Sequence, residues 1–272
     1  MAEPKSPTQR PFPVEFVVQA FSLIVAILLV HAIYVSFVRP NADAILREDA
    51  LRMQEEEDFV ARRSPWVLIR DYEQETCFIL MIWALAIMVY KGASAVREHK
   101  LLQLELVPVS GGMKILPEDT REYARHIQAL PKAVQGFLLP RALLTALHRF
   151  HSTGSIQDVS TAVHTVCESE SDRLESELSM VRYIAWAIPS IGFIGTVRGI
   201  GEALAQAHRA VEGDIAGVTQ SLGVAFNSTF IALVLSIFLM FALHQLQLHQ
   251  ERLVFDTESY CDQHLIGHLR VH

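Results

Sequence analysis

Cysteine is scarce in this chain, and its three cysteines lie far apart: Cys77, Cys167 and Cys261 among 272 residues. One falls in an apolar stretch and two in separate hydrophilic segments, which argues against a disulfide framework. Aromatic residues are also few, at 8%, although 51% of the residues are hydrophobic and the mean hydropathy is +0.26. Such an excess of aliphatic side chains indicates a membrane protein rather than one large soluble core.

The signatures of several other functions are missing as well. No basic run indicates binding to nucleic acid, and the net charge of −7 is spread along the chain. The sequence contains no phosphate-binding loop, no dinucleotide fingerprint and no nucleophile–base signature. We therefore expect a protein that is not an enzyme and has no resident cofactor.

Long apolar stretches are what the sequence has instead. Val14–Val38 exceeds the roughly 20 residues that a bilayer requires of a helix, and Gly223–Leu243 carries no charge. Thr76–Val96 is long enough if Lys91 extends its amine toward the membrane surface, and Val181–Leu204 is apolar but spotted with polar residues. The sequence therefore predicts an all-α membrane protein with transmembrane helices at 14–38, 76–96, 181–204 and 222–243.

The segments between these helices set the predicted orientation. The only sizeable hydrophilic segment is 97–180, with helices expected at about 117–130 and 140–150. Lysine and arginine are more numerous on its side of the membrane than on the other, and such an excess marks the cytoplasmic side. The predicted order is a cytoplasmic N-terminal arm (1–13), a periplasmic loop (39–75), a cytoplasmic helical segment (97–180), a second periplasmic loop (205–221) and a cytoplasmic C-terminal helix (244–272).

A long helix is predicted to lead into the third span. Apolar residues from Ile156 to Val181 recur at steps of three, four and seven, and no helix breaker stands between Ser155 and Pro189. Ser155 and Asp158 resemble the capping pair that begins a helix. The part of this helix before the membrane would extend about 35 Å.

The third span gives up apolar surface along one face. At 100° per residue, Gly192, Gly195, Thr196, Gly199 and Ala203 fall within one sector of about 100°. The small residues Gly195 and Gly199, four apart, allow another helix to approach backbone to backbone. Two interpretations of the glycines are open, namely plain helix packing and a contact surface for a partner helix.

The fourth span repeats this pattern in the stripe Ala225, Thr229, Ala232 and Ser236. One threonine in lipid can simply bond the carbonyl four residues earlier. Two small, hydroxyl-bearing faces on neighbouring spans can instead line a polar path through the membrane. The candidates for an ion pathway are Thr196, Thr229 and Ser236, and those for packing against a partner helix are Gly192, Gly195, Gly199, Ala225 and Ala232.

Charge and proline mark two further positions in the third span. Arg198 and Glu202 are four residues apart, so their side chains can pair. An arginine in a membrane is a functional candidate by default, so this is either a structural pair or one with a role in conduction or partner docking. Pro189 removes a backbone donor and leaves the carbonyl of Ala185 without its usual partner, which predicts a kink.

Cys261, His264 and His268 are the only candidates for a metal site. Their side chains are of types that bind zinc, but three residues spread along a helix at i, i+3 and i+7 rarely converge on one ion. Exposed histidines near the C-terminus are the simpler interpretation, and no metal is expected.

The last two spans resemble a known family. The stretches "AIPSIGFIGTVRGIGEAL" and "SLGVAFNSTFIALVLSI" are similar to the last two membrane helices of the MotA/TolQ/ExbB proton-channel family. Pro189, Gly192, Gly195-Thr196-Val197 and Gly199 stand at the hallmark positions of that family, and Thr229 matches the hydroxyl of its following helix. Arg198 stands where familiar members often have an apolar or aromatic residue. Four spans around one large hydrophilic segment resemble the flagellar-stator branch.

The resemblance implies a homopentamer whose third and fourth helices surround two single-span partners of the MotB/TolR/ExbD kind. Such a partner carries an essential membrane aspartate that the threonines face, and the proton motive force drives rotation. The chain would then be a stator-type motor subunit in a bacterial inner membrane, driven by protons or sodium ions. The third and fourth spans have no titratable group at their centres, so a relay carboxylate must come from elsewhere. The alternative is a non-conducting membrane scaffold that assembles through the glycine stripe.

Overall fold

The computed structural model describes residues 14–55, 64–104, 106–107, 114–211, 213 and 215–271. In this part of the chain the structure is helical and has no strand, only an isolated bridge between Ile115 and Leu269. Four helices are long and apolar enough to cross a membrane, which confirms the predicted fold class. They lie within Phe16–Arg52, Tyr72–Gln103, Ile156–Ala205 and Ala216–His268. The arm predicted at 1–13 lies outside the described residues.

The chain divides into two compact units. The first comprises Met1–Ile87 and Met180–Ala242, and the second comprises Met88–Ser179 and Leu243–His272. Two long helices, α4 (Tyr72–His99) and α11 (Ala216–His264), contribute residues to both units. The first unit holds the predicted channel residues, and the second holds most of the hydrophilic segment.

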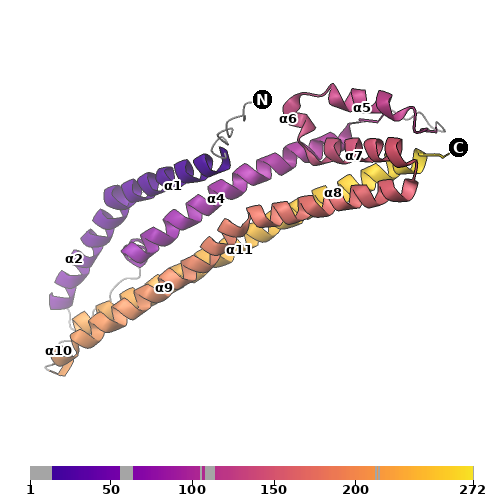
Figure 1. Cartoon of the computed structure of the whole chain (residues 1–272). Helices are drawn as coiled ribbons and strands as arrows, with labels where there is room; N and C mark the ends of the chain where they lie inside the picture. The colour runs from indigo at the N-terminus through magenta and orange to yellow at the C-terminus, as the bar shows by residue number, and fades with distance from the viewer. Residues whose placement is uncertain are drawn as a thin grey trace, which may run out of the picture. The chain divides into compact units, whose positions relative to one another are not determined.

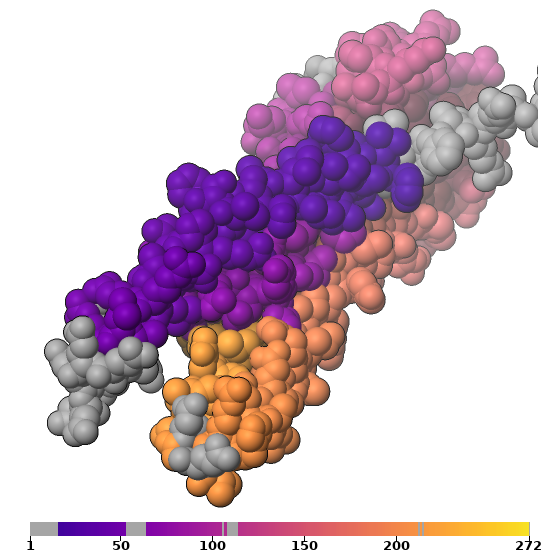
Figure 2. Space-filling model, turned by 90° about the vertical axis from the view of Figure 1, so that its left-hand side faces the viewer, coloured from indigo at the N-terminus to yellow at the C-terminus, as the bar shows by residue number. Residues whose placement is uncertain are grey.

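The first unit begins with helix α1 (Val14–Ile33), which packs on α4. Val30, Tyr34 and Val38 are buried against apolar side chains that include Phe78 and Ile82 of α4. The opposite face of α1 is apolar and exposed, with Phe21 at 67%. Figure 2 shows the N-terminal helices lying at the surface of the face that it presents. A helix with apolar residues on both faces suits a membrane span.

A π-helical turn, η1 (Tyr34–Val38), separates α1 from α2 (Arg39–Glu55), and the helix bends there (Figure 1). The N–H of Arg39 bonds the carbonyl of Tyr34, five residues back, and Pro40 follows. A proline ring clashes with the carbonyl four residues earlier, so a wider turn before it relieves that contact. The buried residues follow every fourth position, Ala26, Val30, Tyr34, Val38 and Ala42. Steps of four drift by about 40° each in an α-helix, and the wider turn resets this drift.

Two segments predicted as loops contain helices. Segment 39–75 includes α2 and the short α3 (Pro65–Leu68), and segment 205–221 includes α10 (Ala207–Val211). Charge along 39–55 suggested a loop, but between Arg39 and Glu55 the only helix breaker is Pro40 in the first turn, where a missing donor is tolerated.

The helix leading into the third span is present but interrupted once. Helix α8 (Ile156–Glu177) ends at Leu178, and α9 (Ser179–Ala205) begins directly afterwards. The N–H of Asp158 bonds the Ser155 hydroxyl at 3.3 Å, which confirms the predicted cap. Helix α9 continues through Pro189.

The second unit has a core made by α7 (Leu138–Thr153), α8 and the C-terminal part of α11. Phe150, Leu143, Val159 and Cys261 are each fully or almost fully buried in it. Helix α7 ends at Gly154, whose φ of 62° lies in the left-handed region that glycine adopts without strain. Helices α5 (Thr120–Gln128) and α6 (Lys132–Gln135) pack on α7. Lys91 bonds Glu177 at 2.7 Å within this unit and is buried.

Candidate hydroxyl site between helices nine and eleven

Thr196 and Thr229 meet at the interface of α9 and α11 in the first unit, where the two helices lie side by side (Figure 1). Their hydroxyl oxygens are in direct hydrogen-bond contact. Thr229 also donates to the carbonyl of Gly192 at 3.0 Å, and Thr196 to that of Ala225 at 3.0 Å. The structure therefore brings together the two residues predicted from separate stripes.

The contacts of this pair outnumber its protons. Besides the three contacts above, Thr196 also lies 3.3 Å from the Gly192 carbonyl. The two hydroxyls therefore have two protons for four contacts. Each hydroxyl oxygen also has two lone pairs. When both protons point to carbonyls, lone pairs of both oxygens remain for a water molecule, a proton donor or a cation. Such a pair can exchange donor and acceptor roles without moving the backbone.

The glycine stripe lies behind the threonines and is buried against α11 of the same chain. A Cβ atom added at Gly192 would lie 2.5 Å from the Cβ of Ala232. One at Gly195 would lie 2.5 Å from the Cβ of Ser228, and one at Gly199 would lie 2.7 Å from a backbone oxygen. This differs from the predicted contact with a foreign partner helix, because α11 already occupies that face. The small residues Ala225 and Ala232 are fully buried in this contact as well.

The threonine pair lies on the edge of α9 and α11 that faces away from α4. Ser228 contacts Gln74 of α4 at 3.4 Å, and Thr229 lies 100° further around α11. Going around α9 from Thr196, away from Gly195, the next side chains are those of Ile200 and Phe193. Phe193 is 62% exposed. Apolar exposed side chains thus flank half-buried hydroxyls on an open edge.

Ser236, seven residues after Thr229 on α11, has a specific partner of its own. Its hydroxyl donates to the carbonyl of Ala185 at 3.3 Å. This is the carbonyl that Pro189 deprives of its helical donor, so a side chain of α11 replaces the missing backbone bond. Ser236 and Pro189 were both singled out in the sequence, but no pattern there indicated that Ser236 bonds the carbonyl that Pro189 leaves without a donor.

A comparison with known families decides what this site belongs to. Residues 137–259, which run from α7 through most of α11, match the model of the MotA/TolQ/ExbB proton channel family. The chain contains a MotA/TolQ/ExbB proton channel domain. This match supports an ion-channel type of function in a multi-pass membrane protein, and the family typically works with a partner subunit in a membrane complex. No curated protein and no solved structure matches the chain.

Arg198 of the channel domain belongs to a cluster of three charges rather than to a pair. It binds both carboxylate oxygens of Glu73 on α4, at 2.7 and 2.8 Å, as well as Glu202 at 3.1 Å. The Glu73 side chain is only 12% exposed. Two carboxylates thus neutralise the membrane arginine and fix α4 against α9. Sequence reasoning missed Glu73 because 125 residues separate it from Arg198.

Glu75 is a second membrane-level residue that the sequence did not single out. Its carboxylate is 7% exposed and bonds His31 of α1 at 2.7 Å and also Arg39. A buried carboxylate requires such partners, and these come from the two sides of the π-helical turn. The cluster ties the bent first helix to α4.

The weak metal candidates do not converge. Cys261 is fully buried in the core of the second unit, and burial raises the pKa of its thiol. The ring of His264 stacks on Tyr260, with 4.2 Å between centroids, and His268 lies beyond α11 in a short 3-10 turn. Among the residues that the structure describes, no group of three or more His, Cys, Asp or Glu residues is placed to hold a metal.

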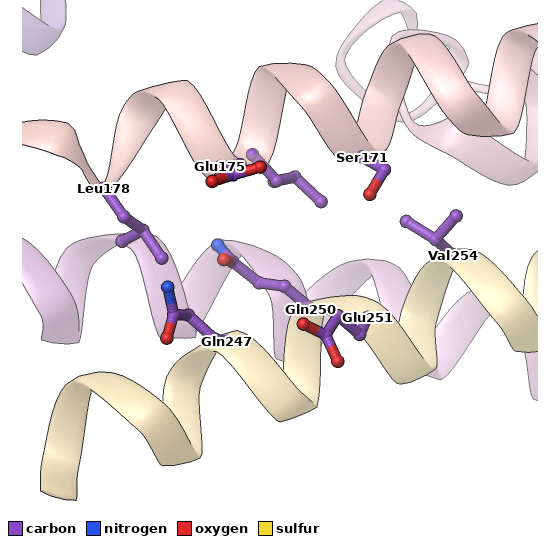
Figure 3. Close-up of a pocket in the computed structure, with 8 residues that line it drawn as sticks. Ser171, Glu175, Leu178, Gln247, Gln250, Glu251 and Val254 are labelled. Carbon is purple, nitrogen blue, oxygen red and sulfur yellow. The ribbon is translucent and has the colours of Figure 1, made fainter.

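A cleft of about 230 Å³ lies between α8 and α11 in the second unit. Figure 3 shows Ser171 and Glu175 of α8, with Leu178 at its C-terminal end, facing Gln247, Gln250 and Glu251 of α11. The polar side chains of this cleft are two carboxylates, two amides and one hydroxyl. None of the residues predicted for ion conduction lines it.

Proposed function

We propose that this chain is the ion-channel subunit of a rotary motor in the bacterial inner membrane. It would convert ion flow, most simply of protons, into motion together with a single-span partner of the MotB/TolR/ExbD kind. The observation that carries this proposal is the Thr196–Thr229 hydroxyl pair at an open edge of a proton channel domain.

The chemistry of the two spans favours a partner that supplies the titratable group. Within the apolar part of α11, residues 222–243, no side chain is charged, and on α9 the charges lie near the ends, at Arg182, Arg198 and Glu202. Hydroxyls can pass a proton or coordinate a sodium ion, but they neither take up nor release a net proton at neutral pH. A partner carboxylate beside the pair would complete the relay. Each charge moved through 100 mV supplies about 2.3 kcal/mol for motion.

The structure favours a definite place for the partner helix. The glycine stripe is filled by α11, so the partner would lie on the neighbouring edge, over Thr196 and Thr229 and between exposed side chains such as Phe193 and Phe226. Five copies of the chain around two partner helices would turn these edges inward. In this arrangement the N-terminus and the hydrophilic segment are cytoplasmic.

The same packing weakens the alternative of a non-conducting scaffold. That alternative depended on oligomerisation through Gly192, Gly195 and Gly199, which have no free face in the structure. It would leave the hydroxyl pair only the hydrogen bonds that join α9 to α11.

The test is the double substitution Thr196→Ala with Thr229→Ala in the chain co-expressed with its partner. We expect ion conduction in proteoliposomes to be lost while the complex still co-purifies, because the substitutions remove only the hydroxyls and one methyl group each. The matched control is Thr219→Ala, which removes an exposed hydroxyl on α11 that bonds its own helix at Ile215. Conduction that survives the double substitution would contradict the proposal.

A further inference from the structure

A basic cleft lies between α5 and α7 in the second unit, where the two helices lie next to each other (Figure 1). Its volume is about 340 Å³, within the range of small-molecule sites. The ionisable side chains that line it are Arg121 and Arg125 of α5 and His148 and His151 of α7. All four are basic.

His151 holds Arg121 in place at one side of the cleft. The Nδ1 atom of His151 lies 2.9 Å from the carbonyl oxygen of Pro117. Because a carbonyl only accepts, Nδ1 carries the proton, and Nε2 of the neutral ring is an acceptor. The guanidinium of Arg121 donates to this Nε2 at 3.3 Å. The arrangement fixes one guanidinium while leaving most of its N–H groups unused.

The positive charge of the cleft is not neutralised by the chain itself. Within the described residues, Arg125 and His148 have no side-chain hydrogen bond or ion pair. The nearest acids in sequence, Glu118, Asp119 and Glu122, do not line the cleft, and Asp119 accepts a hydrogen bond from the N–H of Leu116. The chain as a whole has a net charge of −7, so this is a local reversal of its overall charge.

We infer that this cleft binds a phosphate-bearing ligand, with Arg121 and Arg125 forming the anion site. The planar guanidinium matches phosphate oxygens with two parallel hydrogen bonds. Residues four apart on a helix have Cβ atoms about 5–6 Å apart, so both guanidiniums can reach one doubly charged phosphate. The cleft also has room for the group that carries the phosphate, either a soluble compound or the headgroup of an anionic lipid.

The experiment uses the full chain in nanodiscs, with two probes. Inorganic phosphate is titrated by calorimetry into nanodiscs of phosphatidylcholine. In a second preparation the chain is extracted with detergent, and mass spectrometry measures how much phosphatidylglycerol stays bound to each chain. The test variant is Arg121→Gln with Arg125→Gln. The control is Lys132→Gln with Arg149→Gln, which removes two exposed charges that do not line the cleft.

Each outcome decides the inference. We expect one of the two probes to bind saturably and to be weakened at least tenfold by the Arg121/Arg125 pair but not by the control pair. Binding of free phosphate identifies a soluble ligand, whereas lipid retention alone identifies a headgroup. Should the glutamine pair unfold, Arg121→Lys with Arg125→Lys keeps the charge and should still weaken binding. Equal weakening by both pairs, or no binding of either probe, overturns the inference.

Discussion

Replacing Gly192 with alanine should push α9 and α11 apart. The new Cβ atom would lie 2.5 Å from the Cβ of Ala232 and 3.2 Å from the Cα of Thr229. Carbon atoms in contact lie about 3.5–4.0 Å apart, so the helices must separate by about 1 Å. These neighbouring atoms belong to the backbone or are fixed to it, and no flexible side chain can swing away.

The cost follows from two opposing effects. Overpacking of this kind costs about 1–3 kcal/mol, whereas alanine is a better helix former than glycine by about 1 kcal/mol. The bond from Thr229 to the Gly192 carbonyl, now 3.0 Å, would also stretch beyond hydrogen-bond length. With about 1 kcal/mol for that lost hydrogen bond, we expect a net loss of about 1–3 kcal/mol in the free energy of unfolding.

The assay is unfolding of the purified chain in mixed micelles with increasing sodium dodecyl sulfate, followed by circular dichroism. Gly201→Ala is the matched control on the same helix, because among the described residues nothing beyond its own stretch of helix lies within 4 Å of a Cβ placed at Gly201. That variant should be stabilised by up to about 1 kcal/mol. If Gly192→Ala proves as stable as Gly201→Ala, the close approach of the two helices is refuted.

Two further predictions concern single hydrogen bonds. Ser236→Ala should lower the free energy of unfolding by about 1 kcal/mol, because the Ala185 carbonyl loses its donor. In a Pro189→Ala background, which restores the backbone N–H, the same substitution should cost nothing. An equal cost in both backgrounds would contradict the account. Glu258 bonds His164 at 3.0 Å and raises the pKa of that imidazole in the folded state, so its stabilisation is complete below the unfolded pKa of about 6.5 and is lost as pH rises through the folded value. Glu258→Gln should therefore lower the melting temperature at pH 6 and leave it unchanged at about pH 9, and the reverse trend would exclude this pairing.

The number of helices able to cross a membrane followed from the sequence because apolar length is a local property. The sequence placed Thr196 and Thr229 on small-residue stripes of neighbouring helices, but Ser236 stands on the same stripe as Thr229, and only the structure shows which of the two meets Thr196. The glycines in the third span indicated that another helix packs closely against it, but not which helix. The spacing of residues within one helix shows which face carries small side chains. Only the packed structure shows that α11 packs against that face.

Other features depended on contacts between distant segments. Glu73 and Glu75 lay in a segment predicted as a loop, and their partners are Arg198, His31 and Arg39. No pattern within any one helix pairs these charges. The π-helical turn left no spacing signal in the sequence, because nearly every residue of 14–38 is apolar. Only Pro40 marks the place where a wider turn relieves a clash.

A density map of the assembled complex with its partner tests the central claim most directly. The account predicts a foreign helix beside the Thr196–Thr229 edge, with a carboxylate within reach of the two hydroxyls. A map in which this edge contacts only lipid, with no helix enclosed by the subunits, would contradict it.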